Sequence, residues 1–362
     1  MKLHNNQFHL LWHLARFGLL DYPSCLELLA TPEITDPVAL SYVFRPLAKN
    51  KYLIKHKDSS VAILAKGRAL FPGLAPLITT GGGVQERKRV MQVSRMAALM
   101  EAQGFPVLNE LPDGAGIYFI PSACWRKIAP GILSTTRFVG MLVGCGLRLA
   151  VYDIGDGSME WQVRAESSLF YTKYGIYETR ATGMLFVCEE EKQEEVAKSI
   201  IRQTMWSRKQ LLRDHCAERN RPTCWSRSPI KLKAQYEHVY LTTPKQIRRH
   251  MISILSEKPW IRRLCEENDG RTGAGDTADI EIWPRRLTIN LATDLLKYVR
   301  FFAAVKDHLK LREQCGDDAA PISYELHIPA RDTAIARMYQ DVNEAEEVRF
   351  YIYRRLENPE SH

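Results

Sequence analysis

Hydrophobic residues near the start of the chain recur at the spacing of one helix face. This i, i+3, i+4, i+7 spacing is met by Phe8, Leu11, Trp12 and Ala15. An α-helix is therefore predicted over residues 5–17, and Gly18 is predicted to end it. A second, short helix is expected after Asp21, with Pro23 in its first turn, where the missing N–H of proline loses no hydrogen bond.

A third amphipathic helix is predicted to begin at Asp36 and Pro37, because Asp is a good N-cap and Pro a good first helical residue. Its apolar stripe consists of Leu40, Val43, Phe44 and Leu47. Its opposite side carries polar residues spaced four apart, Ser41, Arg45 and Lys49. Pro46 lies inside the segment and lacks an N–H, so a kink or an early end of this helix is expected.

The pattern then changes to that of a β-hairpin. The segment YLIKHKDSSVAIL, residues 52–64, contains two alternating runs around the turn-forming sequence Lys-Asp-Ser-Ser. A helical pattern resumes in residues 65–71. Three helices followed by a hairpin are typical of a winged helix-turn-helix domain. In that fold the third helix enters the DNA major groove and the hairpin, or wing, contacts phosphates or the minor groove.

The polar side of the third helix and the wing therefore form a candidate DNA-binding surface. Ser41 and Arg45 are expected near base edges, and Tyr42 belongs to the same surface. The residues expected near phosphates are Lys49, Lys51, Lys55 and Lys57. Winged helices also dock proteins or serve as scaffolds, and DNA binding is the favoured of these three interpretations.

A Pro- and Gly-rich segment, residues 72–83, predicts a linker between a first domain, 1–71, and a second, 84–215. The second domain is expected to begin with an amphipathic helix over 84–103. The inward side chains of this helix are expected to be Val90, Val93, Ala97, Leu99 and Met100. Further helical and strand patterns predict strands at 116–120, 137–144, 147–155 and 183–190, and a helix at 159–175.

This order of helix, three strands, helix and strand matches the core of restriction-endonuclease-like nucleases. Active members place an acid on the second core strand and an acid-x-lysine pair on the third, around a divalent metal ion. Residues 137–144 contain no acid, and neither Asp153 nor Asp156 has a lysine two residues further on. We predict a non-catalytic relative without metal or other cofactor. The alternative is a divergent nuclease that uses Asp153 with Glu160 or Glu101.

A winged helix, a Gly/Pro linker and a degenerate nuclease-like domain resemble the replication-relaxation family of conjugative and mobilisable elements. The resemblance covers roughly residues 5–215 and is greatest in RFVGMLVGCGLRLAVYDIGDGSMEW, residues 137–161. It implies an accessory or initiation protein that binds double-stranded DNA at a replication or transfer origin. The implied partners are a relaxase or other transfer and replication proteins, and a second copy of the chain. A winged-helix transcriptional regulator is the remaining alternative.

The net charge of +8 is concentrated in two segments. Lys and Arg exceed Asp and Glu by four over residues 1–80 and by eleven over 202–263. This distribution favours a polyanionic partner. The second segment adds four candidate DNA-binding residues, Arg208, Lys209, Arg248 and Arg249. Trp206 and Trp225 lie among its basic residues, and Thr243 is expected to cap a helix there.

Residues 216–362 are expected to comprise this basic segment and a small α/β unit, so the overall fold class is α+β. Strands are predicted at 280–283, 286–292, 322–328 and 348–355, with a helix at 293–311.

The eight cysteines show no metal-site spacing, which favours reduced thiols in a cytoplasmic protein. No membrane span or secretory signal is predicted, and the Gly-Lys-Ser/Thr of a phosphate-binding loop is missing.

Overall fold

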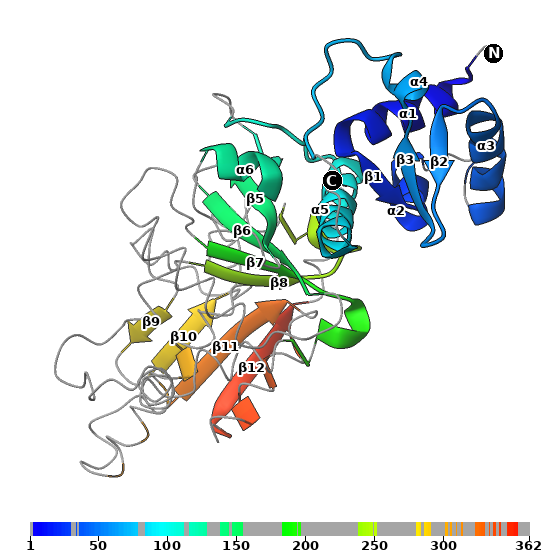
Figure 1. Ribbon diagram of the computed structural model, residues 1–362. Coiled ribbons are helices and arrows are strands. Elements are labelled where there is room, and N and C mark those ends of the chain that lie inside the picture. The colour runs from blue at the N-terminus through cyan, green and yellow to red at the C-terminus, as the bar shows by residue number, and fades with distance from the viewer. Residues whose placement is uncertain are drawn as a thin grey trace, which may run out of the picture. The chain divides into compact units, whose positions relative to one another are not determined.

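The chain is mixed α and β, in agreement with the predicted fold class (Figure 1). Contacts divide it into one unit of residues 1–153 and 162–181 and another of residues 154–161 and 182–362. The computed structural model describes residues 3–29, 34, 36–78, 84–111, 116–128, 138–144, 147–154, 183–193, 195–196, 238–248, 250–251, 280–283, 286–290, 301–302, 305, 309, 313, 323–329, 333, 336–337, 340–341 and 346–353.

Residues 3–78 form what we call the N-terminal module. Its elements are α1 (Asn5–Phe17), β1 (Leu19–Asp21), α2 (Tyr22–Leu29), α3 (Pro37–Lys49), β2 (Leu53–Lys55), β3 (Ser60–Ile63) and α4 (Ala65–Arg68). The strands form an antiparallel sheet in the order β1-β3-β2. The three predicted helices and the hairpin are therefore present. Strand β1 was not predicted, because three residues are too few to show a periodicity.

Helix α1 has the predicted bounds, but one residue of its predicted buried face is exposed. Phe8 is 44% exposed and contacts the ring of Phe71, whereas Leu10, Leu14 and Phe17 are fully buried. The helix contacts α2, α3, α4, β3 and α5, so it buries more than one stripe. It ends at Gly18, whose φ of 78° is favourable for glycine and whose N–H donates to the Leu14 carbonyl.

Helix α3 begins as predicted, with the Asp36 carboxylate accepting hydrogen bonds of 2.8 Å from two backbone N–H groups. Its predicted inward residues Leu40, Phe44 and Leu47 are buried. The expected early end at Pro46 is wrong, because the helix continues to Lys49. The burial of Leu47, beyond Pro46, stabilises this last turn.

The rest of the first unit contains α5 (Val84–Ala102), β4 (Tyr118–Pro121), α6 (Ser122–Ile128), β5 (Phe138–Gly144) and β6 (Leu147–Asp153). Strand β5 pairs antiparallel with both β4 and β6. Helix α5 contacts α1, α2 and β1 of the N-terminal module and also β4 and β5. The inward residues predicted for α5 are buried, and so are Met96 and Ala98. This helix is therefore packed on more than one face.

The second unit contains β7 (Gly183–Val187), η1 (Glu190–Lys192) and β8 (His238–Thr242), and β7 pairs parallel with β8. A four-stranded sheet has the order β12-β11-β10-β9, with bounds Val348–Tyr353, Ser323–Pro329, Arg286–Asn290 and Ile280–Trp283. These confirm the four strands predicted for the last third of the chain. The helix predicted at 159–175 and most of the basic segment, 202–263, lie outside the described residues.

Three cysteines of the described ranges, Cys25, Cys124 and Cys188, are buried and form no disulfide bond. No helix of the same ranges has the length and apolar character needed to span a bilayer.

Candidate nucleic-acid interface

The outward face of α3 combines exposed apolar and cationic side chains. Val38 and Tyr42, one turn apart, are each 64% exposed. Arg45 is exposed on the next turn, with its guanidinium carbon 5.5 Å from the Tyr42 ring centroid. This cation–π contact holds the Arg45 side chain along the helix surface without neutralising its charge. Ser41, also predicted to face DNA, is half-buried.

The lysines expected near phosphates occupy two different environments. Lys49, Lys51 and Lys57 are exposed. Lys55 is half-buried, and its ammonium lies 4.8 Å from the Phe44 ring centroid and 5.4 Å from that of Tyr22. Lys55 is therefore less accessible to a phosphate than Lys57, although both were expected near phosphates. Lys55 is the last residue of β2 and lies on the face that covers these rings, whereas Lys57 lies beyond the strand, in the turn.

The turn between β2 and β3 is organised by Asp58. Its Oδ1 accepts hydrogen bonds from the hydroxyl of Ser60 at 2.6 Å and from the backbone N–H of Ser60 at 3.1 Å. The hydrogen bond from the Ser60 hydroxyl, with a smaller contribution from the Arg87 charge, lowers the pKa of Asp58 below its ordinary value. Asp58 is therefore ionised at neutral pH and engaged by neighbouring donors.

Two basic residues of α4 add to this surface and were missed by the sequence analysis. Lys66 and Arg68 are exposed. The Lys66 ammonium donates to the Asn50 carbonyl at 3.2 Å and lies 4.6 Å from the Tyr52 ring centroid. These contacts place it beside the end of α3. In the sequence, Lys66 is only one lysine of a short helical pattern. It lies next to Asn50 only because the chain folds so that α4 meets the end of α3.

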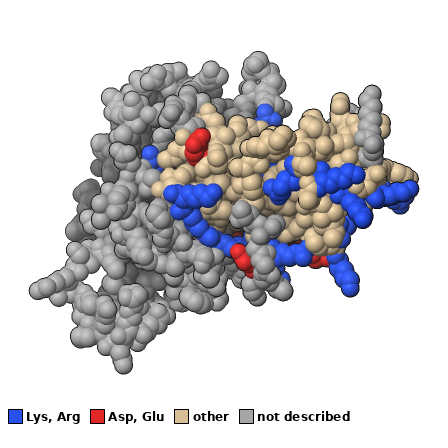
Figure 2. All heavy atoms as spheres, turned by 45° about the horizontal axis from the view of Figure 1, so that its top comes forward, with Lys and Arg blue, Asp and Glu red and all other residues tan. Residues whose placement is uncertain are grey.

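Positive charge is therefore in excess over this part of the module. Lys and Arg side chains recur along the described surface in Figure 2, where few acidic side chains are visible. The acidic residues of the described segment 36–78 are Asp36 and Asp58, one occupied as a helix cap and the other in the turn. Its exposed cations are Arg45, Lys49, Lys51, Lys57, Lys66 and Arg68. Such a surface attracts a polyanion.

Only part of the second basic segment is described. Arg208, Lys209 and Arg249 lie outside the described residues, and Arg248 is exposed. The predicted N-cap at Thr243 is wrong. Its backbone carbonyl accepts from the Gln246 N–H at 3.0 Å, but its buried hydroxyl has no hydrogen-bond partner among the described residues.

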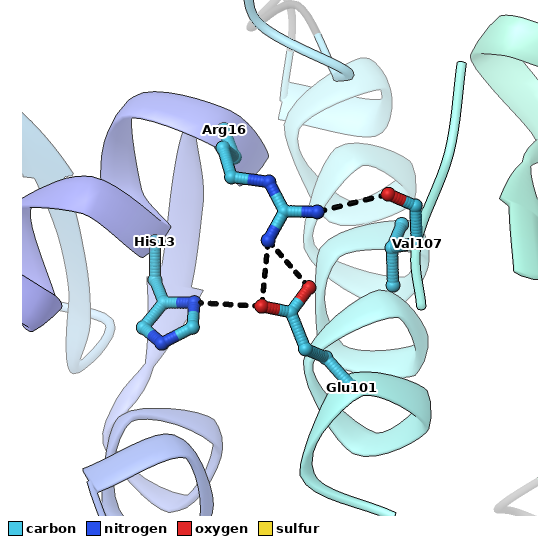
Figure 3. Close-up of polar contacts among 4 residues, drawn as sticks. All are labelled: His13, Arg16, Glu101 and Val107. Atoms are coloured by element: carbon cyan, nitrogen blue, oxygen red, sulfur yellow. Dashed lines mark hydrogen bonds and ion pairs between the residues drawn. The ribbon is translucent and has the colours of Figure 1, made fainter. Parts of the chain in front are cut away.

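Glu101, an alternative metal ligand in the sequence analysis, has a structural role (Figure 3). Nη1 of Arg16 donates to both carboxylate oxygens at 2.6 Å, and Nη2 donates to the Val107 carbonyl at 2.9 Å. Nδ1 of His13 lies 3.4 Å from the same carboxylate. Burial acts to raise the pKa of Glu101, but the His13 and Arg16 contacts outweigh it and lower the pKa.

The proposed set of nuclease ligands is not assembled in the described part of the chain. Asp153 is half-buried at the end of β6, and Asp156 and Glu160 lie outside the described residues. No group of three or more His, Cys, Asp or Glu side chains able to hold a metal ion occurs among the residues that the structure describes.

Comparison of this chain with protein-family models, curated proteins and solved structures finds no match.

Proposed function

We propose that this chain binds double-stranded DNA and that its N-terminal module acts as a winged helix. The observation that supports this proposal most directly is the outward face of α3, where Arg45 and Lys49 are exposed and the only acid at that helix is its cap, Asp36. The hairpin β2–β3 adds Lys57 at the adjoining turn. A cationic helix face next to a cationic hairpin is suited to a groove and its bordering phosphates.

In this proposal, different residues of α3 and the wing contact bases and phosphates. Arg45 donates hydrogen bonds to a base edge, for which the guanidinium fork matches the O6 and N7 acceptors of guanine. Val38 and Tyr42 are exposed apolar neighbours suited to the methyl group of thymine. Lys49, Lys51 and Lys57 bind phosphates, which contribute affinity without sequence information.

We further propose, from the layout resemblance, that this DNA binding serves replication or transfer of a mobile element, as an accessory or initiation protein. The middle of the chain then acts as a non-catalytic platform for a relaxase, for another transfer protein or for a second copy. The commitment of Glu101 to Arg16 supports a structural role for this acid over a metal-binding role.

The test is a salt titration of DNA binding by the full chain, with fluorescence anisotropy on a random-sequence 40-base-pair duplex. Lys57→Ala should lower the slope of log K against log salt by about 1, because one phosphate contact is lost. Arg45→Ala should weaken binding to a site selected from random duplexes by about 1–3 kcal/mol and relax its preference at one position.

Two further variants sharpen this test. Lys127→Ala removes an exposed lysine of α6, away from the proposed surface, and should leave the slope unchanged. The Lys55→Ala/Lys57→Ala double variant should match Lys57→Ala in slope, because Lys55 covers aromatic rings. Unchanged affinity and slope for both Arg45→Ala and Lys57→Ala would contradict the proposal.

A further inference from the structure

The start of helix α5 lies beside the turn of the hairpin β2–β3. Nη2 of Arg87 donates to the Ser60 hydroxyl at 2.9 Å and lies 3.4 Å from Oδ2 of Asp58. These residues are 27 and 29 positions apart in the sequence, so only the fold brings them together. The first turn of α5 is thereby attached to the element that we propose as the wing.

This contact changes the charge of the turn. Asp58 is the one carboxylate of the turn, residues 56–59, and it would repel a phosphate placed there. Arg87 neutralises it, and its side chain remains 37% exposed. Lys57, next to Asp58 in the sequence, and Arg87, in contact with Asp58, therefore leave this turn with no excess negative charge.

The cationic surface continues along α5 to Lys88. This residue is exposed, and no carboxylate of the described chain lies within ion-pair distance of it. Gln92 and Arg95 follow on the same face at i+4 and i+7. Glu86 is exposed two residues earlier, which places it about 200° around the helix from Lys88.

The surface ends at Arg95, where acidic residues of α2 and β1 begin. Its Nε lies 3.9 Å from Oδ2 of Asp21. Burial raises the pKa of Glu27, and the nearby charge of Arg95 acts in the opposite direction. Arg95 is thus compensated by two carboxylates, whereas Lys88 is not.

We propose that the first turns of α5 extend the DNA-binding surface, with Lys88 and Arg87 contacting phosphates that flank the segment bound by α3 and the wing. This inference rests on the proposed function and adds a second, sequence-independent contact region. The ion pair of Arg16 with Glu101 fixes the far end of α5 to α1. Helix α5 is therefore already positioned before DNA arrives, and ordering it on binding costs little entropy.

The experiment compares Lys88→Ala with Arg95→Ala in the full chain, by anisotropy on the random 40-base-pair duplex across a KCl series. Lys88→Ala should lower the salt slope by about 1 and weaken binding on the order of fivefold to tenfold at 0.1 M salt. Arg95→Ala is the matched control, a cation on the same helix face, and should leave slope and affinity unchanged. Thermal unfolding by circular dichroism should show that both variants remain folded and unfold cooperatively, so that a loss of binding by Lys88→Ala is not caused by unfolding.

A hydroxyl-radical footprint on a selected site gives a second measurement. Lys88→Ala should lose protection at one edge of the site and keep it at the centre, whereas Arg45→Ala should lose protection at the centre.

If the Arg45 and Lys57 variants weaken binding but Lys88→Ala does not, the extension of the DNA-binding surface to α5 is wrong and the proposed function stands. Equal effects of Lys88→Ala and Arg95→Ala would indicate diffuse attraction and overturn the extension. If none of the four variants alters binding, the proposed function itself fails.

Discussion

At the scale of single residues, Arg16 shows how a side chain in an ordinary amphipathic helix becomes central to the fold. Its side chain is 11% exposed, and its guanidinium carbon lies 4.3 Å from the Trp12 ring centroid. A buried guanidinium is tolerated only when its donors are paired. Glu101 and the Val107 carbonyl supply this pairing from residues 85 and 91 positions away.

Replacing Arg16 with alanine should therefore destabilise the protein by about 3 kcal/mol, because the Glu101 carboxylate, whose side chain is 18% exposed, is left without its main partner. The free energy of unfolding in urea measures this loss. The Arg16→Met/Glu101→Leu double variant should lose less than the sum of the two single variants, because no charge remains unpaired. A loss below about 0.5 kcal/mol for Arg16→Ala, typical of an exposed residue, would contradict this account.

At the scale of elements, helix α3 begins where its N-cap predicts, at Asp36, but does not end where its proline predicts, at Pro46. Its start follows Asp36, whose carboxylate accepts from the N–H groups of Val38 and Ala39. Its end does not follow Pro46, because burial of Leu47 and hydrogen bonds from the backbone and side chain of Asn50 to the Pro46 carbonyl continue the helix. A side-chain cap depends only on residues a few positions away. Whether a proline ends a helix also depends on the packing of the residues after it.

Asp36→Ala should reduce the free energy of unfolding by about 1 kcal/mol, because two backbone donors lose their acceptor. Asp36→Asn keeps an N-cap acceptor while removing the charge and should retain most of this stability. Urea unfolding of both variants separates the cap from the charge. An equal loss in the two variants would show that the charge, and not the cap, is what stabilises α3.

At the scale of the whole molecule, α5 makes the first unit larger than the predicted winged-helix domain. Besides the ion pair of Glu101 with Arg16, the Ser94 hydroxyl donates to the Phe17 carbonyl at 2.8 Å. Helix α5 also contacts α2 and β1. The linker predicted at 72–83 is thus followed by a helix that packs back on the module before it.

A fragment of residues 1–78 should consequently be less stable than one of residues 1–111, which restores α5 and the carbonyl of Val107. The shorter fragment exposes the α5-facing surfaces of α2 and β1 and leaves Arg16 without its acceptors. The urea midpoint of each fragment, followed by circular dichroism, measures the difference. Equal midpoints would show that the N-terminal module is complete without α5.

The sequence by itself determined those elements whose bounds depend on residues a few positions apart in the chain. The bounds of α1, the hairpin β2–β3 and the strands of the last sheet follow from periodicity, caps and turn residues a few positions apart. Their basic side chains were also visible in the sequence, which is why the candidate surface on α3 could be named in advance.

Tertiary structure alone decided which of these side chains are available and what lies next to them. Lys55 covers two aromatic rings, Glu101 is bound to Arg16, and Arg87 reaches the turn at Asp58. Each contact joins residues that are distant in the chain, or on faces whose burial depends on a neighbouring element. No pattern in one sequence specifies such pairs, because periodicity shows which side of an element is apolar and not what packs against it.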